Sequence, residues 1–73
     1  MKALYICATT HGTIRAERTL RRHKINVTVI PVPREVSSEC GMAIELEQTD
    51  KTAAQKVIKK EEIDGMWYGV GVS

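Results

Sequence analysis

Two stretches, Asn26-Val-Thr-Val-Ile-Pro-Val32 and Met42-Ala-Ile-Glu-Leu-Glu47, decide the fold, because both show strand patterns and no helical pattern separates them. In the second stretch apolar and polar side chains alternate, so Met42, Ile44 and Leu46 point to one face of a strand. The residues between the two stretches are mostly polar and follow a proline, which is typical of a loop. We therefore expect two consecutive strands joined by a long connection.

Strand and helix patterns alternate on both sides of this pair. The flanking elements are strands over residues 3–8 and 65–72, and helices over residues 11–23 and 50–61. Thr9 or Thr10 can cap the first helix. The order β-α-β-β-α-β predicts one α/β (α+β) domain of the ferredoxin-like kind over residues 1–73. Such a domain has a four-stranded antiparallel sheet with both helices on one face.

The alternation predicts which side chains face the helices and which face away. The open face of the sheet is expected to carry Tyr5, Cys7, Ala43 and Glu45, if Leu4, Ile6, Met42 and Ile44 face the helices. The buried helix positions are expected to be Thr13, Ala16, Leu20 and His23, then Ala53, Ala54, Val57 and Ile58. Cys7 lies in an apolar run and is expected to be buried in the sheet. Trp67 and Tyr68 point to opposite faces, and the pattern leaves open which is exposed.

Composition narrows the class of protein. The chain has 73 residues, 42% of them apolar, and a formal charge of +2 from eleven Lys and Arg against nine Asp and Glu. This balance argues against obligate nucleic-acid binding and against disorder. The chain shows no secretory cleavage pattern and no run of membrane-spanning length, so we expect a cytoplasmic protein that does not bind membranes. Two cysteines are too few for a disulfide scaffold or a zinc motif, so no metal site is expected.

Cys40 is the candidate reactive residue. It lies in the polar segment Pro31-Val-Pro-Arg-Glu-Val-Ser-Ser-Glu-Cys-Gly41, near Arg34 and directly before Gly41. A structural cysteine prefers an apolar interior, whereas a cysteine in a polar loop beside a cation is placed like a reactive one. Arg34 favours the thiolate, so we expect the pKa of Cys40 to lie below the usual value of about 8.5.

The predicted topology places Cys40 near the start of the first helix. The first and third strands are antiparallel neighbours, so the end of one lies beside the start of the other. Cys40 should then sit close to Thr10, His11 and Gly12, where unpaired N–H groups and the helix dipole stabilise an anion. Gly12 permits close backbone approach. The expected site is Cys40 with Thr10, His11, Gly12, Arg34 and Gly41 around it.

The same residues carry a resemblance to a known family. The resemblance is based on Thr10-His11, Ala16-Glu17, the run from Val29 to Ser38 and Cys40-Gly-Met-Ala43. They resemble the small bacterial and archaeal selenium/sulfur carrier protein-like domains over nearly the whole chain. The resemblance implies that Cys40 carries sulfur or selenium as a persulfide or perselenide, with no other cofactor. It also implies a donor enzyme and an acceptor protein as partners, and a carrier or accessory protein more than a stand-alone enzyme. The chain departs from the family pattern at Glu45, where a basic residue is common.

Other interpretations stay open at this point. The chain could be a non-catalytic ferredoxin-like interaction or regulatory module that uses the basic face of the first helix, and its open sheet face would allow a homodimer. RNA binding on the sheet needs aromatic side chains on both central strands, and only Tyr5 is available. A Cys40–His11 pair could act in nucleophilic catalysis. Cys40 could also be a passive loop residue, with Arg34 paired to a neighbouring glutamate.

Overall fold

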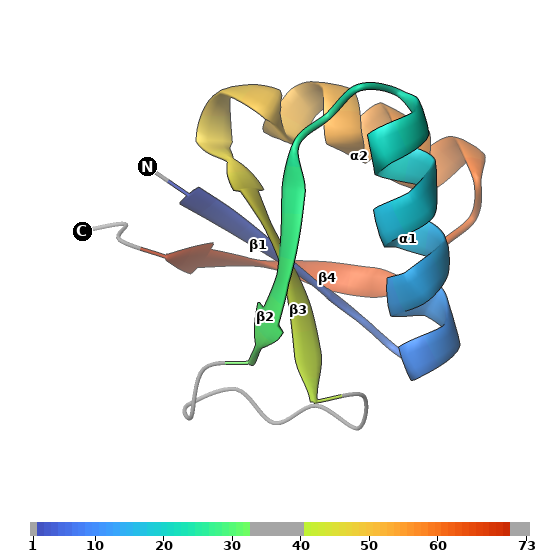
Figure 1. Ribbon diagram of the computed structural model, residues 1–73, viewed down its shortest axis with the longest axis vertical. Helices are drawn as coiled ribbons and strands as arrows, with labels where there is room; N and C mark the ends of the chain where they lie inside the picture. Colours follow the sequence, from blue (N-terminus) through green and yellow to red (C-terminus); the bar gives the residue numbers. More distant parts are fainter. Residues whose placement is uncertain (1, 33–40, 71–73) are drawn as a thin grey trace.

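The computed structural model describes residues 2–32 and 41–70, which form one sheet and two helices (Figure 1). The elements in chain order are β1 Lys2–Cys7, α1 Thr10–Arg22, β2 Val27–Pro31, β3 Met42–Glu47, a short 3-10 turn Gln48–Asp50, α2 Lys51–Lys60 and β4 Gly65–Val70. The sheet order is β2-β3-β1-β4, and each neighbouring pair is antiparallel. This arrangement confirms the expected α+β ferredoxin-like fold.

The strand register decides which side chains face the helices. Tyr5 lies opposite Ile44 of β3 and opposite Trp67 of β4, and Ile44 lies opposite Val29 of β2. Residues opposite each other in antiparallel strands share a face, so these four form one row across the sheet. All four contribute to the apolar cluster between the sheet and the helices, which we call the main core.

The expected orientation of β1 is therefore wrong. Tyr5 and Cys7 belong to the main core and are only 4% and 1% exposed, while Leu4 packs with Ala43 on the opposite face. Both alternating sets in β1 are apolar, so hydrophobic periodicity alone could not choose between the two faces. The orientation expected for β3 is confirmed, because Ile44 belongs to the main core and Ala43 to the other cluster.

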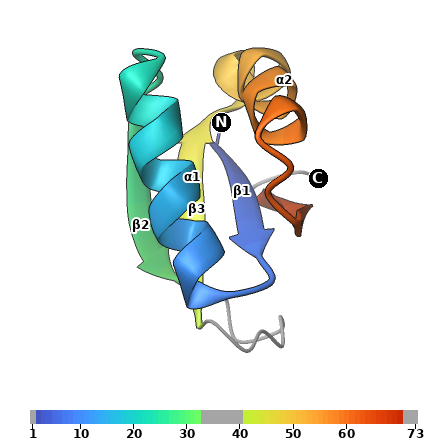
Figure 2. The ribbon, with the colours of Figure 1, turned by 90° about the vertical axis from the view of Figure 1, so that its right-hand side faces the viewer.

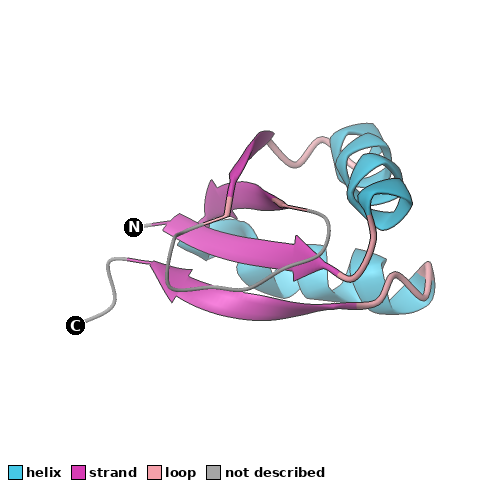
Figure 3. Ribbon diagram, turned by 90° about the horizontal axis from the view of Figure 1, so that it is seen from below, coloured by secondary structure: helices cyan, strands magenta, loops and turns pink. Residues whose placement is uncertain are grey.

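Both helices cover the same face of the sheet, α1 over β1, β2 and β3, and α2 beside β1 and β4 (Figures 2 and 3). The buried helix residues are Thr13, Ala16, Thr19 and Leu20 of α1, and Ala54 and Ile58 of α2. Two expected core residues are exposed. His23 lies past the last turn of α1, and Ala53 points one step, about 100°, away from Ala54 on the helix.

The face without helices carries a second apolar cluster. Leu4, Ile6 and Ala43 are at most 4% exposed, and Ile30, Val32 and Tyr68 pack against them. Tyr68 thus lies on this face and Trp67 on the helix face. The central strands present no aromatic side chain here, so Tyr5 no longer supports an RNA-binding surface.

Both helices end in the same hydrogen-bonded turn. In α1, Ile25 N–H donates to the Leu20 carbonyl at 3.0 Å, and in α2, Ile63 N–H donates to the Ile58 carbonyl at 3.1 Å. The residue before each isoleucine has a left-handed backbone, with φ of 62° at Lys24 and 54° at Glu62. This is the Schellman motif, in which an apolar residue after the turn packs back on the helix. It buries both isoleucines and aims the carbonyl of Ile63 toward β1.

Candidate functional site

The start of α1 is held by Thr9. Its backbone is extended, with φ −137° and ψ 159°, and its Oγ1 accepts a hydrogen bond from the Gly12 N–H at 2.9 Å. The Thr9 carbonyl accepts from the Thr13 N–H at 3.0 Å and from Thr13 Oγ1 at 3.2 Å. Thr9 is therefore the N-cap, and it occupies one of the donors that could otherwise meet a bound anion.

Two donors of the first turn stay available to a ligand. Within residues 2–32 and 41–70, no acceptor meets the N–H of Thr10 or that of His11. The first turn also contains no acidic residue of its own, so the positive end of the helix is not balanced from within α1. Whether Thr10 and His11 stabilise an anion on Cys40 stays a prediction.

A small hollow of about 160 Å³ adjoins this helix start. We call it the corner hollow, and its lining consists of Ala8, Thr9, His11, Gly12, Arg15, Glu62, Ile63 and Asp64. The connection between β1 and α1 is tied to that between α2 and β4 by a hydrogen bond from Ala8 N–H to the Asp64 carbonyl at 3.0 Å. The start of α1 and the end of α2 therefore meet at this corner.

The corner hollow contains charges of both signs. Arg15 Nη2 donates to the Glu61 carbonyl at 3.1 Å and lies 3.7 Å from Glu61 Oε1. The carboxylates of Glu62 and Asp64 lie in the same lining as His11. Sequence reasoning missed the two acidic residues, although their place directly after the second helix was a signal that could have found them. They offset part of the positive end of α1, so an anion bound here would need a further cation.

Gly41 directly precedes β3 and follows Cys40 in the sequence. It is exposed, with φ of 70°, and its carbonyl accepts from Val32 N–H at 3.2 Å. A residue with a side chain would be strained at this φ, so glycine suits the position. The register that pairs Tyr5 with Ile44 would, if continued, place Gly41 opposite Ala8. The starts of β3 and α1 lie at the same end of the molecule in Figures 1 and 2.

Two of the six expected site residues, Cys40 and Arg34, lie outside the described residues. The structure brings together His11 and Gly12 in the corner hollow, and it places Thr10 in the same helical turn. The approach of Cys40 and Arg34 to this turn stays a prediction. In the described part of the chain, no three His, Cys, Asp or Glu side chains gather in a way that could hold a metal ion, and no helix is long and apolar enough to cross a membrane.

The fold and the helix start together define a small ferredoxin-like α+β domain with a polar corner at the start of α1. A family model described as "Putative Se/S carrier protein-like" matches residues 2–67. The match covers nearly the whole chain, so the chain belongs to this family. No match was found among curated proteins or among solved structures.

Proposed function

We propose that the protein carries sulfur or selenium on Cys40, in the reducing cytoplasm, between a donor enzyme and an acceptor protein. The observation that supports this function best is membership of the Se/S carrier protein-like family over a match that includes position 40. The other cysteine, Cys7, is only 1% exposed within the core, which leaves Cys40 as the candidate to meet a partner.

The proposed loading step is a transfer between two sulfurs. The Cys40 thiolate attacks the terminal sulfur of a persulfide on the donor, and a new sulfur–sulfur bond forms on Cys40. The sulfur–sulfur bond of the donor breaks, and the donor cysteine leaves as a thiolate. No oxidant or reductant is consumed. Delivery to the acceptor repeats the same exchange, and selenium in place of the transferred sulfur gives the perselenide.

The helix start offers what this step requires. The attacking group and the loaded persulfide are both anions. The N–H groups of Thr10 and His11, for which the described residues offer no acceptor, lie at the positive end of α1, which favours an anion. Arg34 would add the further cation that the carboxylates of the corner hollow make necessary. The φ of Gly41 turns the chain sharply directly after Cys40.

The test is the intact mass of the protein after incubation with a cysteine desulfurase and cysteine. We expect an adduct of one or more sulfur atoms on the wild type and on Cys7→Ala, and none on Cys40→Ser. An unmodified wild type, or an equal adduct on Cys40→Ser, would contradict the proposal. Repeating the incubation with selenocysteine as the donor substrate shows whether selenium is accepted as well.

A second experiment tests the role of the helix start separately. Thr10→Pro places a proline at the first position of α1, where proline is tolerated, and removes one N–H donor. If that donor supports the persulfide, this variant should load more slowly than wild type while its far-UV circular dichroism stays unchanged. Thr10→Ala changes the same side chain but keeps the N–H donor, and it is the matched control. If all three proteins load at the same rate, the start of α1 does not contribute to the site.

A further inference from the structure

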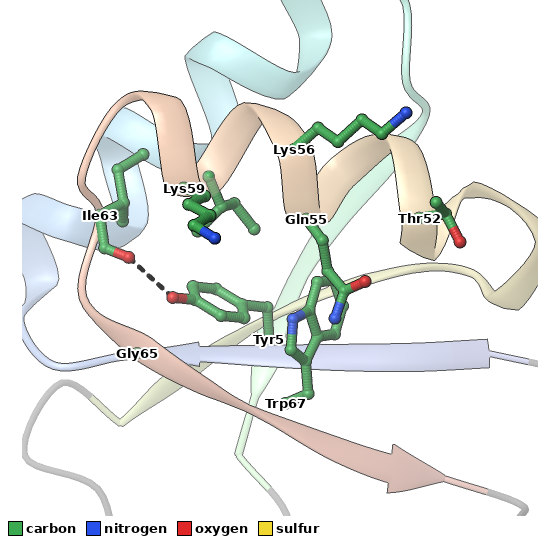
Figure 4. A pocket seen from close by; sticks show the side chains of 9 residues that line it. Tyr5, Thr52, Gln55, Lys56, Lys59, Ile63, Gly65 and Trp67 are labelled. Carbon is green, nitrogen blue, oxygen red and sulfur yellow. Dashed lines mark hydrogen bonds between the residues drawn. The ribbon is translucent and has the colours of Figure 1, made fainter.

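A larger hollow lies on the other side of the α2–β4 connection (Figure 4). Its volume is about 560 Å³, and we call it the α2–β4 hollow. Its apolar lining consists of Tyr5, Ile58, Ile63, Gly65 and Trp67, and its polar lining comes from α2 and consists of Thr52, Gln55, Lys56 and Lys59. The volume is within the range of small-molecule sites, about 300–1,000 Å³.

Tyr5 and Trp67 form a fixed aromatic floor. They are direct partners across β1 and β4, with ring centroids 5.0 Å apart and planes at 60°. The Tyr5 hydroxyl donates to the Ile63 carbonyl at 2.7 Å, which holds the ring in place. An added Cβ on Gly65 would lie 2.7 Å from Tyr5 Cε2, so the ring rests directly against the glycine. Tyr5 is buried and Trp67 is half-buried, which leaves the indole to meet a ligand.

The charge around this floor is positive. Lys59 extends beside the Tyr5 ring in Figure 4, and Lys51 Nζ lies 5.3 Å from the centre of the Trp67 ring. Lys56 also contributes to the lining, although its ammonium group extends away from the two rings. The lining contains no acidic residue, and among the described residues none of these lysines forms an ion pair. Gln55 of α2 also lines the hollow and adds a donor and an acceptor.

We infer that the α2–β4 hollow binds a planar aromatic ligand that carries an anionic group and is about the size of a mononucleotide. The ring system would contact the Trp67 indole, because a flat apolar surface matches another by stacking. The anionic group would lie near Lys59, which lines the hollow beside the Tyr5 ring.

Titration of the full chain followed by tryptophan fluorescence tests this site, because Trp67 is the single tryptophan. The probes are AMP and naphthalene-1-sulfonate, both aromatic anions, with adenosine as a neutral aromatic and ribose 5-phosphate as an anion without an aromatic ring. We expect both aromatic anions to bind with a Kd of about 1 mM or tighter, and each of the other two to bind more weakly. If neither aromatic anion binds, or if ribose 5-phosphate binds as tightly as AMP, the inference is overturned.

Matched lysine variants locate the binding. Lys59→Gln should weaken AMP binding about two- to fivefold, the effect of losing one exposed charge pair. Lys60→Gln removes the same charge from the next residue of α2, which does not line the hollow, and should bind like wild type. Trp67→Leu, followed by calorimetry, should bind about tenfold more weakly or worse. An equal effect of the two lysine variants would overturn the assignment even if Trp67→Leu failed to fold.

Discussion

Replacing Tyr5 by phenylalanine should destabilise the protein through a single hydrogen bond. The Tyr5 side chain is 4% exposed, and its hydroxyl donates to the carbonyl of Ile63 at 2.7 Å. Phenylalanine keeps the ring and its contact with Trp67, so packing changes little. No other hydrogen bond to the Ile63 carbonyl occurs among the described residues, so the variant leaves a buried acceptor without a partner.

The magnitude follows from these contacts. A typical hydrogen bond contributes about 1 kcal/mol net, and the unsatisfied carbonyl brings the expected loss in unfolding free energy to about 1–2 kcal/mol. For a domain of 73 residues, each kcal/mol lowers the Tm by about 4–8 °C. Urea unfolding followed by Trp67 fluorescence measures the difference at about pH 7. A loss well below about 0.5 kcal/mol would refute the assigned role of this hydroxyl.

Wild type and Tyr5→Phe should also differ in how their stability depends on pH. Burial, with smaller contributions from Cys7 and Asp64, raises the pKa of Tyr5 from 10.0 to about 12. The stability from the protonated phenol is complete below about pH 10 and is lost as pH rises toward 12, because the unfolded chain releases this proton first. Wild type should therefore lose stability relative to Tyr5→Phe above about pH 10, while the other titrating groups are shared. A difference that stays constant to about pH 11 would contradict the reasoning.

Further predictions concern two glycines, Lys24 and Cys40. Gly65→Ala should lower the unfolding free energy by about 1–3 kcal/mol in urea, because its Cβ would lie 2.6 Å from a carbonyl oxygen of β1. Gly12→Ala, whose closest contact would be 3.2 Å, should cost much less. Lys24→Gly should raise the melting temperature through a gain of about 0.5–1 kcal/mol, since glycine adopts the φ of 62° without strain; a lower temperature would refute this. Alkylation of Cys40, measured on Cys7→Ala, should have a pH midpoint below about 8.5, and a higher midpoint would exclude a stabilised thiolate.

Part of the candidate site could be predicted from local sequence. Thr9 or Thr10 before a helical stripe predicted an N-cap, and it is the Thr9 hydroxyl that accepts from Gly12 N–H. Antiparallel pairing predicted that Gly41 would enter β3 near the end of β1, and the register agrees. The acidic residues of the corner hollow, Glu62 and Asp64, were not predicted, because they reach it only through the way α2 ends and turns back.

The order of apolar patterns along the chain by itself determined the four strands, the two helices and the ferredoxin-like topology, because period and turn chemistry are local properties. Tertiary structure alone decided the orientation of β1, since Leu4 and Ile6 are as apolar as Tyr5 and Cys7. The register with β3 turned Tyr5 toward the helices and paired it with Trp67. That choice depends on contacts between residues far apart in the chain, and it created the aromatic floor of the α2–β4 hollow.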